Sequence, residues 1–350
     1  MYAIIIHHLI VHGVLGFKYR NYAKQIELIN IGTFWHVSSF ALISGFIGYK
    51  TCKYSNLLYL WLCALFYSVS IHYLIKKYKP EFGRDLKFRC EFFPVLYNRY
   101  WYFSEYFGMY LFLPIINNGI SILNKSQLKI LVISTHFIFI PLHYYINFTY
   151  DTFRMADGRS VLWLLTFYLV GAYLGKYKIK YTGIKRIILC IICIFVYISS
   201  TLLCFNFTVD PSLFQKFFKN PKIILLFSRL FVMRLNSVPM ILQAISITIF
   251  FTQIKYNKYI AKIISFIGPL TFGIYLIHDN IIIRNNVIHN IFVKESNNLS
   301  LNAVIKLLFI TGLKVFSICF IIEFIRHILF TILRIRKICI FIFKLMFKIF

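Results

Sequence analysis

Long apolar stretches separated by short polar and mostly basic segments make up the chain. Most stretches are 15 to 24 residues long with few charges, close to the length an α-helix needs to cross a hydrocarbon core about 30 Å thick. Segments of about ten residues with alternating hydrophobicity, typical of a membrane barrel, do not stand out. The pattern predicts an all-α, polytopic integral membrane bundle of about ten transmembrane helices. The expected spans are residues 1–16, 31–49, 55–75, 100–117, 128–146, 161–175, 187–205, 238–253, 260–283 and 303–325.

The first of these stretches is short for a span. A spanning helix has about 17 to 25 residues, whereas the polar segment here already starts at Phe17. The stretch has neither the basic start nor the small-residue cleavage site of a signal peptide. We therefore expect either a start codon assigned too far downstream or a truncated chain.

Composition supports the membrane assignment. Apolar residues make up 59% of the chain and charged residues 14%, against about 25% charged in a soluble domain. The net charge is +28, but the basic residues are scattered over many loops. This distribution favours anchoring to lipid headgroups, so we expect membrane lipid and no nucleic acid as a partner.

The last 25 residues differ from the preceding spans because their charges recur at helical spacing. Wound as a helix at 100° per residue, five basic side chains fall within about 80° of arc, and Ile, Leu and Phe fill the rest. We therefore expect a membrane domain at 1–325 and a basic amphipathic helix at 326–350 lying on an anionic lipid surface. An eleventh span is the alternative. The five basic residues are Arg326, Arg334, Lys337, Lys344 and Lys348.

Ionisable residues within apolar spans are costly there and so are candidates for function. Three histidines cluster in the first stretch, where His8 and His12 are four residues apart and share a helical face, while His7 points about 100° away. For any one of them, a structural hydrogen bond to a neighbouring helix is the alternative. The other candidates are His36, Arg99 with Glu105, His278 with Asp279, Lys306 with Lys314, and Glu323.

Five stretches follow one another along the chain: HHLIVHG, WHVSSFALISGFIGYK, YWYFSEYFGMYLFLPIIN, NSVPMILQAISITIFF and FGIYLIHDN. In this order they resemble the membrane acyltransferase 3 family, most closely its bacterial polysaccharide O-acetyltransferases. The likeness runs from residue 1 to about residue 326. It implies an enzyme of the bacterial plasma membrane that takes acetyl-CoA from the cytoplasm and acetylates a sugar hydroxyl of a surface or secreted polysaccharide, either as a glycan or as a lipid-linked saccharide.

The best-known motif of that family is an arginine followed, about ten residues later, by a histidine in the first span. By resemblance the histidine is His8, with His7 beside it. The arginine, which is thought to serve the acyl donor, would lie before Met1. The sequence assigns no residues to the binding of acetyl-CoA.

Acetyl transfer from a thioester to an alcohol needs a base, and imidazole suits that role near neutral pH. We predict His8 as the base with His7 beside it, and Glu105 as the carboxylate that stabilises the imidazolium, with Asp279 as the competing carboxylate. A covalent acyl-enzyme on Ser44 ranks second, because no nucleophile elbow is present. We expect no metal. The predicted substrate contacts are Arg99, Trp101, His36 and His278.

Another class of protein would share many of these features. A transporter, flippase or polymerase of lipid-linked saccharides also has many spans, aromatic belts and buried charges. Transporters often contain internal repeats with interrupted helices at corresponding positions, and the sequence has no visible repeat. The acyltransferase interpretation is therefore preferred, with this class as the alternative.

Overall fold

A computed structural model describes residues 1–349 except 84–86, 147–149 and 178–180. Within these residues the regular elements are all helical, which confirms the all-α prediction. Among the described residues, six helical stretches are long and apolar enough to cross a membrane, and three apolar helices are shorter: α1 (Tyr2–Val11), α9 (Val161–Lys176) and α13 (Val238–Gln253). The predicted number of ten spans is not confirmed. The six are Arg20–Gly48, Tyr54–Tyr78, Lys125–Ile146, Gly183–Val209, Lys258–His278 and Leu301–Ile332.

The chain forms two compact units that each combine distant parts of the sequence. The first contains Met1–Ile26, Lys53–Phe107 and Tyr256–Phe350, and the second contains Glu27–Cys52 and Gly108–Lys255. The division falls inside two helices, α3 (Ala23–Thr33) and α6 (Trp101–Ile122).

Close contact between α4 (His36–Gly48) and α9 (Val161–Lys176) organises the second unit. A Cβ atom on Gly45 would overlap the carbonyl group of Tyr168, and one on Gly171 would overlap that of Leu42. Glycine therefore lets the two backbones touch, which is how small residues commonly join membrane helices. The rest of this unit includes α7 (Lys125–Phe137), α8 (His143–Ile146), α10 (Gly183–Val209), α11 (Leu213–Phe217), α12 (Pro221–Phe231) and α13 (Val238–Gln253).

The first unit begins with a helix that stops early. α1 (Tyr2–Val11) has ten residues, which corresponds to about 15 Å, or half of a hydrocarbon core. Val14 then adopts the left-handed backbone conformation, with φ of 53°, before the short α2 (Leu15–Lys18). The expected continuous span at 1–16 is therefore wrong, because this turn breaks the helix just after the histidine cluster.

A second interruption shapes the expected span at 260–283. α14 (Lys258–Ile267) and α15 (Thr271–His278) are joined by a turn of 3₁₀ helix at Gly268–Leu270, where Pro269 lacks a backbone donor. The chain leaves the helix after His278, and the Asn280 side chain accepts a hydrogen bond from the Ile282 amide to start α16 (Ile281–Ile283). Asp279 therefore lies at a corner rather than inside a continuous helix, which corrects the expected span.

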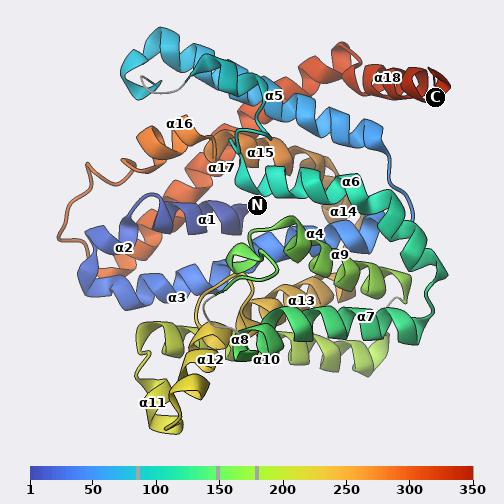
Figure 1. The fold of residues 1–350 in the computed structure, drawn as a ribbon. Coiled ribbons are helices and arrows are strands. Elements are labelled where there is room, and N and C mark those ends of the chain that lie inside the picture. Colours follow the sequence, from blue (N-terminus) through green and yellow to red (C-terminus); the bar gives the residue numbers. More distant parts are fainter. Residues whose placement is uncertain (84–86, 147–149, 178–180, 350) are drawn as a thin grey trace. The chain divides into compact units, whose positions relative to one another are not determined.

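Helix α17 (Leu301–Ile332) packs against both α1 and α15 (Figure 1). The Ser300 side chain caps its first turn by accepting a hydrogen bond from the Ala303 amide. This packing holds the histidine cluster of α1 and the Asp279 corner within the same unit.

The C-terminal stretch is divided differently from the prediction. α17 continues through Arg326, which is buried, and α18 (Ile335–Ile349) starts after Arg334, whose φ of 52° breaks the helix. Arg326 is therefore not part of a basic surface. Helix α18 packs against α5 (Tyr54–Tyr78), where Tyr54 stacks on Phe343 (Figure 1).

The remaining basic residues of this stretch fit an amphipathic helix. Arg334, Lys337 and Lys344 are exposed, as are several apolar residues of α18. The side chain of Lys348 and residue 350 lie outside the described residues. Attachment of α18 to a lipid surface stays a prediction.

The contact between α4 and α9 can be tested with one methyl group. Gly45→Ala should destabilise the protein by about 1–3 kcal/mol, because the added carbon has no room beside the neighbouring backbone. Gly119→Ala on α6 is the control, since no atom lies within 4 Å of its added Cβ, and it should stabilise the protein by up to about 1 kcal/mol. Thermal unfolding in detergent measures both. Equal effects of the two variants would contradict close packing at Gly45.

Candidate active site

An imidazole and a carboxylate face each other where α1 meets the end of α15. The Nδ1 atom of His8 lies 3.6 Å from Oδ1 of Asp279. Both residues are buried, with 8% of His8 and 1% of Asp279 exposed. A base and an acid buried together in an apolar unit stabilise each other's charged forms, so this pair is the starting point for the site.

The orientation of the His8 ring decides which of its nitrogen atoms can accept a proton. Because Nδ1 of His8 faces the carboxylate, the tautomer that carries its proton on Nδ1 leaves Nε2 with the lone pair. The distance of 3.6 Å exceeds that of a normal hydrogen bond, and such contacts often tighten only when substrate binds. His8 is thus arranged to accept a proton on Nε2 while the carboxylate stabilises the resulting cation.

Arg284 supplies the positive charge that a buried carboxylate needs. Its Nη1 atom donates a hydrogen bond of 3.2 Å to Oδ1 of Asp279. A carboxylate buried in apolar surroundings is strongly disfavoured in its charged form unless it is paired. Arg284 therefore helps Asp279 to remain ionised beside His8.

A second imidazole lies next to His8. The ring centroids of His8 and His278 are 5.1 Å apart. Nδ1 of His278 donates to the Ile274 carbonyl at 2.7 Å, which leaves Nε2 as the acceptor. Within the described part of the chain, Nε2 is buried and has no hydrogen-bond partner. His278 can therefore accept a hydrogen bond from a bound molecule, whereas His8 has the Asp279 carboxylate at 3.6 Å to stabilise its protonated form.

The other two histidines of the first stretch are close neighbours. The ring centroid of His8 is 5.7 Å from that of His7 and 4.9 Å from that of His12. One ligand atom each from His8, His12 and Asp279 lies within 4.8 Å of the others, so these three could hold a metal ion. The guanidinium group of Arg284 opposes this, because it already places a positive charge on the Asp279 oxygen. The expectation that no metal is needed stays a prediction.

A second buried carboxylate organises the segment before α6. Nη2 of Arg99 lies 2.8 Å from Oε1 of Glu91, and Nδ1 of His72 lies 3.4 Å from the same oxygen. The Ser68 hydroxyl donates to the other oxygen of Glu91. Because Ser68 and His72 belong to α5, Glu91 docks its loop segment, Phe88–Phe92, against that helix.

Tyr100 connects this cluster to the candidate catalytic pair. The Asn280 side chain donates a 2.9 Å hydrogen bond to the Tyr100 hydroxyl. Tyr100 follows Arg99 in sequence, and Asn280 follows Asp279. Arg99 and Tyr100 therefore help to fix the corner that presents Asp279 to His8.

A third buried cluster joins α5 to α17. Glu323 and Arg326 form an ion pair, and the Tyr67 hydroxyl donates to Glu323 at 2.6 Å. Nη1 of Arg326 also donates to the Tyr59 hydroxyl at 3.0 Å. A Cβ atom on Gly273 would overlap the Glu323 carboxylate. The intramembrane Glu323 is thus fully engaged with groups of this unit and joins its helices.

Comparison with known proteins identifies the family. A model of the acyltransferase 3 family, described as an acyltransferase domain, matches residues 1–326. The chain belongs to the acyltransferase 3 family. Searches of curated proteins and of solved structures each returned no match. The family and the apolar helices together make the protein a membrane acyltransferase, which confirms the resemblance seen in the sequence.

For this acyltransferase, the structure brings some predicted site residues together. His8, His7 and His278 are neighbours, and the carboxylate beside His8 is Asp279, the alternative to Glu105. Glu105 is half-buried on α6, and its role in orienting His8 stays a prediction.

The remaining predicted residues have local neighbours of their own. Trp101 packs edge-on against Tyr102, with ring centroids 5.8 Å apart. His36 belongs to the second unit, where its Nδ1 atom donates to the Thr33 carbonyl at 2.6 Å. Arg99 pairs with Glu91. Substrate contacts from these three residues stay predictions.

Two charged residues of the acyltransferase were missed from the sequence. Arg284 follows Asp279 by five residues, and a search for a cation near each intramembrane acid would have found it. Glu91 lies in a polar, basic loop and resembles an exposed residue. Its burial depends on contacts with Ser68, His72 and Arg99, which no local pattern reveals.

The ion pair between Arg99 and Glu91 makes a testable prediction. Arg99→Gln should destabilise the acyltransferase by about 3–5 kcal/mol, because the Glu91 carboxylate would stay buried without its cation. The double variant Arg99→Gln with Glu91→Gln should recover most of that stability. Thermal unfolding of both variants in detergent provides the measurement. Unchanged stability of Arg99→Gln, with a raised KM for acceptor or donor, would instead make Arg99 a substrate contact.

Proposed function

We propose that this acyltransferase moves an acetyl group from acetyl-CoA to a sugar hydroxyl of a surface or secreted polysaccharide, in the plasma membrane of a bacterium. The observation that carries the proposal is the buried pair of His8 and Asp279 in a chain of the acyltransferase 3 family. An imidazole oriented by a carboxylate is the commonest arrangement for a general base in acyl transfer.

The orientation of His8, with Nδ1 toward Asp279 and the lone pair on Nε2, defines the steps of the transfer. Nε2 of His8 takes the proton from the acceptor hydroxyl as that oxygen attacks the thioester carbonyl carbon. The new carbon–oxygen bond forms, the carbon–sulfur bond breaks, and the leaving thiolate takes the proton from the imidazolium. The products are an acetyl ester and free CoA, and His8 returns to its starting state.

Neighbouring groups support this cycle in different ways. Asp279 stabilises the imidazolium, and Arg284 keeps that carboxylate ionised. His278, with its buried Nε2 atom available as an acceptor, can hold a second hydroxyl of the acceptor sugar. We prefer direct transfer to an acyl-enzyme on Ser44, because the sequence has no nucleophile elbow.

Loss of the base should remove the acetyl groups. His8→Ala, expressed in a strain that lacks the chromosomal copy, should reduce acetylation of the cell's polysaccharide by roughly 10² to 10⁴, the usual contribution of a general base. Acetyl signals in the NMR spectrum of the purified polysaccharide provide the measurement. His289→Ala is the matched control, because His289 is an exposed histidine of the same unit, and it should leave acetylation unchanged.

The result separates the candidate functions. Full acetylation by His8→Ala, at a normal protein level, would remove His8 from the reaction. If deletion of the whole gene shortened the polysaccharide or stopped its export while the acetyl content per sugar stayed constant, the transporter or polymerase class would replace acetylation.

A further inference from the structure

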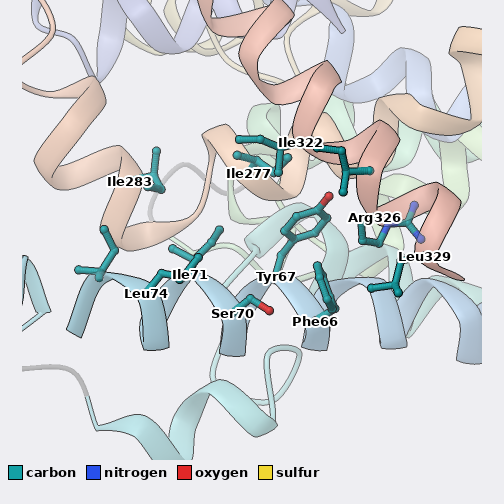
Figure 2. A pocket seen from close by; sticks show the side chains of 12 residues that line it. Phe66, Tyr67, Ser70, Ile71, Leu74, Ile277, Ile283, Ile322, Arg326 and Leu329 are labelled. Carbon is teal, nitrogen blue, oxygen red and sulfur yellow. The ribbon is translucent and has the colours of Figure 1, made fainter. Parts of the chain in front are cut away.

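An apolar groove runs along α5 in the first unit, on the side where α15, α16 and α17 pass (Figure 2). Its volume is about 370 Å³, at the low end of the roughly 300–1,000 Å³ typical of ligand pockets. In Figure 2, Ile283 lies over Leu74 at one end, and Leu329 and Phe66 lie at the other. A groove of this size can hold one hydrocarbon chain.

The lining of the groove favours a hydrocarbon occupant. Its polar groups are Ser70 and the buried Tyr67 and Arg326, and the last two are hydrogen-bonded to Glu323. The rim of the groove is exposed: 51% of the Leu74 residue surface is accessible. Because α5 and α17 are both candidate membrane spans, this rim faces lipid, and an alkyl or isoprenoid chain can enter from the side.

One end of the groove carries positive charge. Leu74 lines this end, and the exposed Lys77 lies three residues further along the same side of α5, in its last turn. Arg284 directly follows Ile283, which lines the same end in Figure 2. Lys77 and Arg284 therefore place positive charge near one end of the apolar groove, which complements a lipid that carries phosphate on one chain.

The charged end also adjoins the candidate catalytic pair. Arg284 donates to Asp279, and Asp279 faces His8. A lipid whose phosphate contacts Arg284 therefore carries the group beyond the phosphate toward the His8 imidazole.

We propose that this groove binds the acetyl acceptor as a lipid-linked saccharide: an isoprenoid chain lies along α5, its phosphate contacts Arg284 and Lys77, and the attached sugar reaches His8. This rests on the proposed function and narrows its acceptor from a free glycan to a sugar still joined to its lipid carrier.

Binding measurements test the groove without acetyl transfer. The full chain in phosphatidylcholine nanodiscs is titrated with decaprenyl monophosphate, with decaprenol, and with dioleoylphosphatidylglycerol as an ordinary anionic lipid. Wild type should bind decaprenyl monophosphate at least about tenfold more tightly than either other lipid. Lys77→Gln should reduce the preference for the phosphate over the alcohol, whereas Lys76→Gln, on the opposite face of α5, should leave it unchanged.

Two filled-groove variants and a matched control locate the site. Ser70→Trp should weaken binding of decaprenyl monophosphate at least about tenfold, because the indole occupies the chain's position. Leu74→Trp, on the exposed rim, should weaken it in the same direction and serves if Ser70→Trp does not fold. Tyr73→Trp, exposed on α5 and outside the lining, should bind as wild type does.

Several outcomes would overturn the inference. These are equal binding of phosphatidylglycerol, equal binding of decaprenol, or binding unchanged by a folded groove variant. Because the readout is binding, the two proposals fail separately. Tight, groove-dependent binding without any acetyl transfer would refute only the proposed function, whereas acetylation of polysaccharide with no groove-dependent binding would refute only the lipid-linked acceptor.

Discussion

The approach of the Asp279 carboxylate to the His8 imidazole is the contact on which the rest of the site depends. Neither group is stable as a lone charge among apolar helices, since an unpaired ion in such surroundings is strongly disfavoured. Their juxtaposition requires α1 to end soon after His8 and α15 to end at His278, so that the next residue turns toward α1. Two helix breaks thus create the site, and Arg284 completes its charge balance.

Two further buried clusters hold that corner in place. Glu91 joins the segment before α6 to α5 through its contacts with Ser68, His72 and Arg99. Tyr100, next to Arg99, accepts a hydrogen bond from Asn280, next to Asp279. The pair of Glu323 and Arg326 joins α17 to α5. Polar networks of this kind are specific because each member must be satisfied where water is scarce. The second unit is different, since its central contact between α4 and α9 depends on glycine.

How far the sequence predicts this arrangement depends on the type of signal. Apolar stretches predict the helices, but they do not reveal the interruption that the structure has between α14 and α15. The histidine cluster and His278 are predicted because ionisable groups are rare in apolar spans. The choice between Glu105 and Asp279 needs three-dimensional information, because residues 8 and 279 are far apart in sequence. The break at Val14 was missed because valine rarely adopts the left-handed conformation. Arg326 was misplaced because its charge fits a basic stripe equally well until its contact with Glu323 is known.

The central claim is that His8 and Asp279 act as one unit in acyl transfer. A double-mutant cycle with His8→Ala, Asp279→Asn and the combined variant, each assayed for the rate of acetyl transfer from acetyl-CoA, tests it most directly. If the carboxylate acts through the imidazole, Asp279→Asn should lower the rate in the wild-type background and have almost no further effect once His8 is alanine. Losses that multiply independently, so that the double variant is slower than His8→Ala by the full factor of Asp279→Asn, would contradict the account.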